Sequence, residues 1–209
     1  MINLLVVDNH PIVRKGMELL FVTSPHIQVV GGVGNGEAIF DFLKENRVDI
    51  VLCEIDLPKL NGLTALRRLK KDFPDVKTII FSAQPEEIYA INTIKAGADG
   101  YLSKTAGIIT LKEAILKVYE GGTFLSNDME EQMKRSRRVS RSGSVYRKLS
   151  TREIEVLKLI SSGRKNKEIA LELNINEKTV STYKTRLLKK LKVDNLADLI
   201  HQSRMFQFS

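Results

Sequence analysis

The sequence predicts a two-domain protein in which a doubly wound, five-stranded parallel α/β sheet is followed by a small all-α domain. The 209 residues exceed the usual size of one domain and fall short of three. Over residues 1–120, short apolar runs alternate with amphipathic stretches of helical spacing. From about residue 150 the pattern is helical throughout. Regular alternation of strand and helix predicts a parallel sheet with right-handed crossovers.

Each predicted strand is a short apolar run that ends at polar or turn-forming residues. The runs cover residues 3–7, 29–30, 50–53, 78–81 and 100–103. A stretch with apolar residues at helical spacing follows every run, for example Ile12, Met17 and Leu20 after the first. The run at 50–53 is continuously apolar, as expected of a strand that helices cover on both faces. A glycine-rich turn at 31–36 lacks the spacing of a dinucleotide-binding fingerprint.

Four helix starts are marked in the C-terminal part. Ser150 and Glu153 form a capping box before the first helix. Asn166, Asn176 and Asn195 can each cap a later one. A short helix, a tight turn and a longer basic helix over residues 177–191 predict a helix-turn-helix within a small four-helix domain.

A basic, flexible linker is predicted at residues 122–147, between domains at 1–121 and 148–209. The segment from Lys134 to Lys148, at the end of this linker, contains seven basic residues and very few apolar side chains. Two interpretations of it stay open: a solvated tether, or an additional contact with DNA phosphates.

The charge is unevenly divided along the chain. The net charge is +8, yet residues 1–120 contain 14 Lys and Arg against 15 Asp and Glu. All of the positive excess therefore lies in the C-terminal part. Such an asymmetry indicates that this part meets a polyanion, and double-stranded DNA is the expected partner.

The remaining composition indicates a cytoplasmic protein. No apolar run reaches the roughly 18 residues that span a membrane, and the N-terminus lacks the charged segment that opens a signal peptide. The single cysteine, Cys53, lies inside a predicted strand and can form no intrachain disulfide, which fits a reducing compartment. We expect no membrane partner.

Polar side chains follow the predicted strands at their carboxyl ends. They are Asp8 and Asn9, Glu54 and Asp56, Ser82, and Lys104. Because the carboxyl ends of parallel strands share one edge, these side chains should face one shallow pocket. Oxygen atoms of Asp8, Glu54 and Asp56 would suit Mg²⁺, while a hydroxyl and an ammonium suit phosphoryl oxygens. The alternative is a set of merely solvated loop residues.

Because of these polar residues and their positions, the first 120 residues resemble a response-regulator receiver domain of the flavodoxin-like fold. In that family, acids after the first strand help to bind Mg²⁺, and an Asp ending the third strand accepts phosphate. A Ser or Thr ends the fourth strand and a Lys ends the fifth. The resemblance implies that Glu54 stands at the phosphoacceptor position, with Ser82 and Lys104 in the pocket. It also implies that Tyr101 is the aromatic switch residue and that Asp56 offers the metal its backbone carbonyl.

Two residues depart from the receiver pattern. Asn9 replaces the second acid, which removes a negative charge and should weaken Mg²⁺ binding. Glu54 replaces the phosphoacceptor Asp, and its carboxylate is displaced by on the order of one carbon–carbon bond, roughly 1.5 Å. In-line transfer tolerates such a displacement badly, but the longer acid can reach toward Ser82 and Lys104. Three interpretations stay open: a pseudo-receiver, a phosphomimic, and residual metal-dependent switching.

Residues 149–191 resemble the LuxR-type four-helix DNA-binding domain. On the helix over 177–191, Val180, Leu187 and Leu191 share one face, and polar residues share the other. The polar face is predicted to enter the major groove, with Lys184 near base edges and other basic residues at phosphates. The alternative is a solvated lysine-rich face. The candidate DNA-binding residues are Lys178, Thr179, Ser181, Thr182, Lys184, Thr185, Arg186, Lys189 and Lys190.

The sequence therefore predicts a two-component transcription regulator of the LuxR/NarL (NarL/FixJ) type, not an enzyme, with an atypical receiver. A homodimer would cover apolar surface of the last helix and the tail, contributed by Leu196, Leu199, Ile200, Met205, Phe206 and Phe208. No cofactor is required, Mg²⁺ is an optional ion, and a sensor histidine kinase is a candidate partner. Two rivals are a regulator switched by a small ligand or metal in the altered pocket, and a Mg²⁺-dependent phosphatase fused to a DNA-binding domain.

Overall fold

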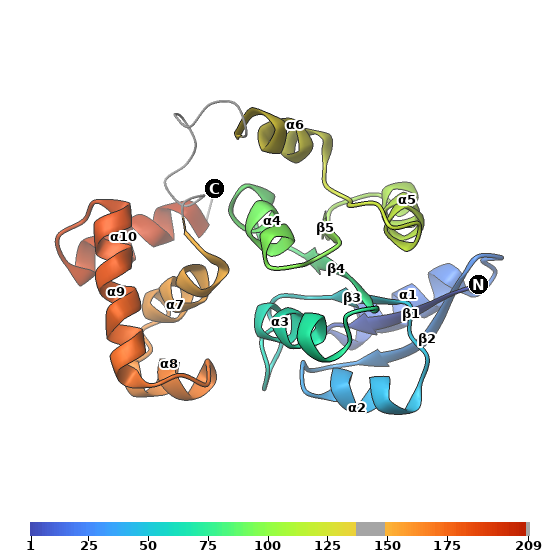
Figure 1. Cartoon of the computed structure of the whole chain (residues 1–209), viewed down its shortest axis with the longest axis horizontal. Helices are drawn as coiled ribbons and strands as arrows, with labels where there is room; N and C mark the ends of the chain where they lie inside the picture. Colours follow the sequence, from blue (N-terminus) through green and yellow to red (C-terminus); the bar gives the residue numbers. More distant parts are fainter. Residues whose placement is uncertain (137–148, 208–209) are drawn as a thin grey trace. The chain divides into compact units, whose positions relative to one another are not determined.

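The computed structural model describes residues 1–136 and 149–207, with all their side chains except those of residues 132–136, 151 and 204–207. The chain divides into two compact units, Met1–Arg138 and Val139–Ser209 (Figure 1). Among the described residues, no helix is both long enough and apolar enough to cross a membrane.

A five-stranded parallel sheet with the order β2-β1-β3-β4-β5 forms the centre of the first unit. Its strands are β1 (Ile2–Val7), β2 (Ile27–Val33), β3 (Ile50–Cys53), β4 (Lys77–Ser82) and β5 (Gly100–Ser103). One helix follows each strand: α1 (Pro11–Phe21), α2 (Ala38–Glu45), α3 (Gly62–Asp72), α4 (Glu86–Lys95) and α5 (Ile108–Tyr119). The predicted doubly wound sheet is therefore confirmed.

Alternate strand residues face opposite layers of helices. Leu4, Leu52 and Ile79 belong to one buried cluster, to which α1 contributes Met17 and α5 contributes Ile115 among others. Helices α1 and α5 therefore cover the same face of the sheet. The intervening strand residues are equally buried and face the layer of α2, α3 and α4 (Figure 1). Burial on both faces explains why the third apolar run is continuous.

The chain beyond α5 continues to pack on the first unit. Phe124 pairs with the β5 edge, where its backbone O accepts from Tyr101 N at 2.9 Å and its N donates to Asp99 O at 3.0 Å. Helix α6 (Asn127–Ser136) follows and contacts α4, with Met129 buried. The prediction of a flexible linker from residue 122 is therefore wrong for residues 127–136. A few apolar residues, such as Leu125 and Met129, suffice to hold this polar segment on the first unit.

Four helices form the second unit: α7 (Thr151–Ser161), α8 (Asn166–Glu172), α9 (Glu177–Leu191) and α10 (Leu196–Gln207). The capping box of Ser150 and Glu153 is present as predicted, and Asn176 caps α9 through its side chain. The cap predicted at Asn166 is wrong, because Asn166 is the first helical residue and Lys165 stands at the N-cap. There Lys165 N donates to the Glu168 carboxylate at 2.7 Å.

The last helix belongs to the core of this unit. Leu199 is fully buried, and the Ser203 hydroxyl forms a hydrogen bond with that of Ser161 on α7. The prediction that Leu199 contributes apolar surface to a dimer is therefore wrong. Leu196 does face solvent, with 42% of its surface exposed.

Candidate functional sites: the receiver pocket and the recognition helix

Glu54 follows β3 and is held by its own loop. Its Oε1 accepts from the backbone N of Ile55 at 2.6 Å and of Asp56 at 3.2 Å. The loop then turns back so closely that a Cβ at Gly62 would lie 2.1 Å from the Glu54 carbonyl oxygen. Only glycine fits at that approach. The carboxylate is thereby fixed at the carboxyl edge of the sheet, with 5% of the residue exposed.

Lys104, just beyond β5, bridges the two buried acids. Its Nζ lies 2.6 Å from Asp8 Oδ2 and 2.6 Å from Glu54 Oε2. Burial opposes the charged forms, but hydrogen bonds between the partners outweigh it: the pKa of Lys104 is raised by Asp8 and Glu54, and the pKa of Asp8 is lowered by Lys104 and His10. Lys104 and Asp8 are therefore both charged at neutral pH.

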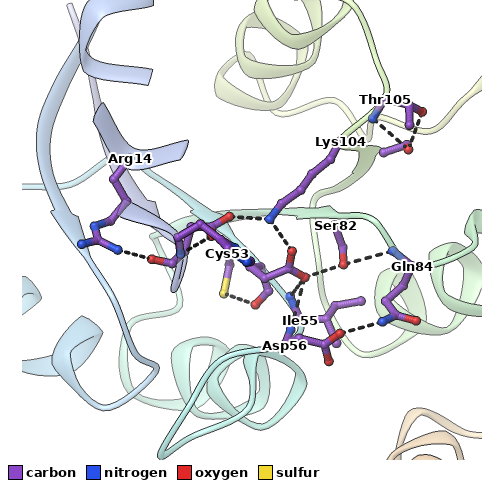
Figure 2. A network of polar contacts seen from close by, with 12 residues as sticks. Arg14, Cys53, Ile55, Asp56, Ser82, Gln84, Lys104 and Thr105 are labelled. Carbon is purple, nitrogen blue, oxygen red and sulfur yellow. Dashed lines mark hydrogen bonds and ion pairs between the residues drawn. The ribbon is translucent and has the colours of Figure 1, made fainter. Parts of the chain in front are cut away.

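The end of β4 and the loop after it contribute two further polar side chains to this cluster. The Ser82 hydroxyl donates to Glu54 Oε1, and the Gln84 side chain donates to Asp56 Oδ2 at 2.6 Å (Figure 2). Tyr101 is fully buried and donates its hydroxyl to the Gln84 carbonyl at 2.7 Å. Burial raises the pKa of Tyr101, so this hydroxyl stays protonated and remains a donor.

The predicted pocket residues are thus brought together, except Asn9, which is exposed. Three further contributors were not predicted: His10, whose Nδ1 lies 2.9 Å from Asp8 Oδ1; Arg14, which donates to the Asp8 carbonyl at 2.6 Å; and Gln84. The position of Gln84 two residues after Ser82 places it at the same edge of the sheet, but its bond to Asp56 depends on the conformation of the loop. Nothing in the pattern of α1 marks Arg14.

The carboxylates are not arranged as a magnesium site. Within the described residues, no group of three or more His, Cys, Asp or Glu side chains is placed to hold a metal ion. Lys104 lies between Asp8 and Glu54, and Gln84 is bonded to Asp56. A side-chain oxygen of each of the three acids contacts a protein donor, so these side chains as arranged do not form a Mg²⁺ site.

Helix α9 presents a polar face to solvent. Val180, Leu187 and Leu191 are buried inside the unit. The exposed candidates are Lys178, Ser181, Thr182, Thr185, Arg186 and Lys189, whereas Thr179 and Lys184 are partly buried. Asn166 at the start of α8 donates to the Ser181 hydroxyl at 3.2 Å and so ties the two helices of the helix-turn-helix. The exposed basic residues Arg164, Lys165 and Lys167 beside this contact were not predicted as part of the surface.

Lys190 differs from the other candidates because it is paired inside the unit. Its Nζ lies 2.7 Å from Glu153 Oε2, and 3% of the Glu153 side chain is exposed. Glu153 also accepts from Ser150 N at 2.7 Å. Against the penalty of burial, the bonds from Lys190 and Ser150 lower the pKa of Glu153. Lys190 therefore joins α9 to the start of α7.

Comparison with known proteins matches both units. A response regulator receiver domain matches residues 4–116, and the bacterial regulatory proteins of the luxR family match residues 147–203. Response regulator UvrY of Escherichia coli (strain K12) is 35% identical over 202 residues, which cover 96% of this chain and 93% of that protein. Response regulator GacA of Pseudomonas aeruginosa is 32% identical over 200 residues, 95% and 94% of the two chains.

A solved structure resembles the whole chain. RcsB from Salmonella enterica serovar Typhimurium, bound to promoter rprA in the presence of phosphomimetic BeF3-, has a TM-score of 0.80 and 23% identity. The match covers 100% of this chain and 98% of that one. At this identity the likeness shows the fold.

A receiver fold and a helix-turn-helix unit in one chain define a two-component response regulator that binds DNA. This chain belongs to the LuxR/NarL-type family of these regulators, with a receiver domain followed by a LuxR-type DNA-binding domain. The resemblance found in the sequence is confirmed.

Proposed function

We propose that this chain is a dimeric, DNA-binding transcription regulator that Glu54 holds in the active arrangement without phosphorylation. One observation carries the proposal: a single buried carboxylate contacts both Ser82 and Lys104. These are the hydroxyl and ammonium that the receiver pattern assigns to the phosphoryl group. Glu54 is therefore positioned to replace that group.

The state of Tyr101 supports this interpretation. In the receiver pattern, the ring moves as the Ser or Thr is drawn toward phosphate. Here Ser82 is bonded to Glu54, and Tyr101 is fully buried with its hydroxyl on Gln84. Both features accompany the fixed charge of Glu54, so no transferred group is needed to produce them.

Glu54 is also a poor phosphoacceptor in this position. Oε1 accepts three hydrogen bonds, and Oε2 is paired with Lys104. Attack on a phosphoryl donor would require one carboxylate oxygen of Glu54 to leave these partners. That oxygen would also have to approach the phosphorus in line, although the Glu side chain is one methylene longer than the Asp of the receiver pattern. A misplacement of about 1 Å can cost on the order of 100-fold in rate.

For DNA binding we propose the exposed face of α9 as the recognition surface. Ser181, Thr182 and Thr185 have the short side chains that read base edges, while Lys178, Arg186 and Lys189 suit phosphates. A two-fold dimer would present two such helices to half-sites about one DNA turn, roughly 34 Å, apart.

The test compares DNA affinities of full-length variants by fluorescence anisotropy. Glu54→Gln keeps the shape of the side chain but removes its charge, so we expect affinity to fall by about tenfold, equivalent to about 1.4 kcal/mol. Glu45→Gln, on the exposed end of α2, is the matched control and should bind as the parent does. Unchanged affinity for Glu54→Gln would contradict the proposal.

A further inference from the structure

Three exposed hydroxyl groups of the proposed recognition surface donate to the backbone of α9 itself. The Thr182 hydroxyl donates to the carbonyl four residues earlier at 3.0 Å, and the Thr185 hydroxyl does the same at 3.2 Å. The Ser181 hydroxyl donates to the Glu177 carbonyl at 3.1 Å. Because a carbonyl oxygen only accepts, the hydroxyl proton points toward the helix in each case. The proton of each of these hydroxyl groups is therefore engaged within α9.

A hydroxyl group whose proton is engaged cannot donate to the acceptor atoms of a base. In the major groove, guanine presents the acceptors N7 and O6, and adenine presents the acceptor N7 beside its N6 amine. Contacts with those acceptors are left to the basic side chains of the surface, which are donors only. The hydroxyl groups of α9, bonded in this way, do not select G·C pairs by donation.

The two threonines keep a second group that can contact a base. Thr182 and Thr185 are exposed and stand three residues apart, which places them on one face of α9. Since each Oγ1 is turned toward the preceding turn of the helix, the Cγ2 methyl group is the free substituent on Cβ. The 5-methyl group of thymine is an apolar group in the major groove, and a threonine methyl group is one of its usual partners.

Ser181 differs from the threonines because it has no methyl group and is bonded on both sides. Besides donating to the Glu177 carbonyl, its hydroxyl accepts from the Asn166 side chain of α8 at 3.2 Å. The Ser181 hydroxyl therefore joins the two helices of the helix-turn-helix. This contact helps to orient the face of α9 on which the threonines stand.

We propose that Thr182 and Thr185 are specificity-determining residues that read thymine through methyl–methyl contacts and not through their hydroxyl groups. The inference rests on the proposed function, in which the exposed face of α9 enters the major groove. It specifies a half-site that contains thymine opposite these two side chains. Loss of one such methyl contact should lower affinity by about fourfold, the effect of returning one apolar carbon to water.

The test uses a DNA duplex that the full-length protein selects from a random-sequence pool. The duplex is then synthesised with deoxyuridine in place of each thymidine in turn, which removes only the 5-methyl group. Affinities are measured by fluorescence anisotropy. For the parent chain, affinity should be about fourfold lower when deoxyuridine stands at a contacted position.

Two matched double variants separate the methyl group from the hydroxyl group. Thr182→Ser/Thr185→Ser keeps the hydroxyl groups but removes the methyl groups, so it should bind the thymidine and deoxyuridine duplexes within about twofold of each other. Thr182→Val/Thr185→Val keeps a methyl group in place and removes the hydroxyl groups, so it should retain the ratio of the parent. Thr23→Ser, in an exposed turn of the first unit, is the control and should bind both duplexes as the parent does.

A preference for thymidine that disappears in the valine variant and persists in the serine variant would assign the reading to the hydroxyl groups and overturn the proposal. So would a parent chain that binds every deoxyuridine duplex as tightly as the thymidine duplex. In both cases the proposed DNA binding through α9 would stand. A parent chain that enriches no sequence from the pool removes the recognition surface of the proposed function as well.

Discussion

At the scale of the residue, the receiver pocket depends on one cation between two buried acids. Lys104 is 2.6 Å from both Asp8 and Glu54, and 18% of its side chain is exposed. A buried carboxylate that loses its partner keeps its desolvation penalty without compensation. The Lys104 ammonium therefore stabilises the fold by compensating both carboxylates, and it is also one of the two groups, with Ser82, that contact the Glu54 carboxylate from other strands.

We expect Lys104→Met to lower the free energy of unfolding by about 3 kcal/mol, because it leaves two like charges facing each other. Chemical denaturation of the full chain, followed in the receiver unit, measures the loss. Adding Asp8→Asn should recover part of it, since one of the two charges is then removed. A loss that Asp8→Asn does not reduce would show that the repulsion is not its cause.

Pocket residues could be predicted where they directly follow a predicted strand. Glu54, Ser82 and Lys104 each follow an apolar run, and parallel strands bring such positions to one edge. Gln84 and Arg14 could not be assigned, because their roles depend on how side chains turn within a loop and across α1. Spacing along the sequence carries no information on that geometry.

At the scale of the element, neighbouring lysines of α9 have different surroundings. Lys189 is exposed, whereas Lys190 is paired with the buried Glu153 on α7. The sequence assigned both to DNA phosphates, because consecutive lysines on a basic helix look alike until the packing partner is known. Similarly, α6 was predicted to be linker because its composition is polar, although Met129 anchors it.

We expect the two lysines to respond differently to substitution. Lys189→Ala should reduce the slope of log affinity against log salt concentration by about 0.9, the value for one lost phosphate contact. Lys190→Met should leave the slope nearly unchanged and should destabilise the second unit by about 1–2 kcal/mol, since a buried carboxylate loses a partner that is itself partly exposed. If both substitutions reduced the salt-dependence slope equally, both lysines would contact DNA phosphates, and the predicted difference between them would be wrong.

Acid should weaken the same contact. The pKa of Glu153 in the folded chain is below its ordinary value of 4.5, so its contribution to stability is present above that pH and is lost as the pH falls through the lower, folded value. The protection factors of α7 amides in the full chain, which correct the exchange rate for its own dependence on pH, should therefore fall below about pH 4.5. In Glu153→Gln this fall should be smaller.

At the scale of the whole molecule, the fold class and the two kinds of domain could be read from the sequence. Alternating strands and helices specify the receiver, and helix caps specify most of the second unit. The functional state could not be read in this way, because it depends on whether Glu54 reaches Ser82 and Lys104 together. Their contacts in the folded receiver are the basis for proposing a regulator that needs no phosphoryl donor.

The most direct test is the DNA affinity of the full chain with and without a small acyl-phosphate donor and Mg²⁺. The proposed function predicts the same affinity within about twofold. Asn9→Asp/Glu54→Asp, which restores both acids of the receiver pattern, serves as the control that should respond to the donor. If affinity of the parent chain instead rises by about tenfold, and Asp56→Ala abolishes the rise, then Glu54 does not replace the phosphoryl group.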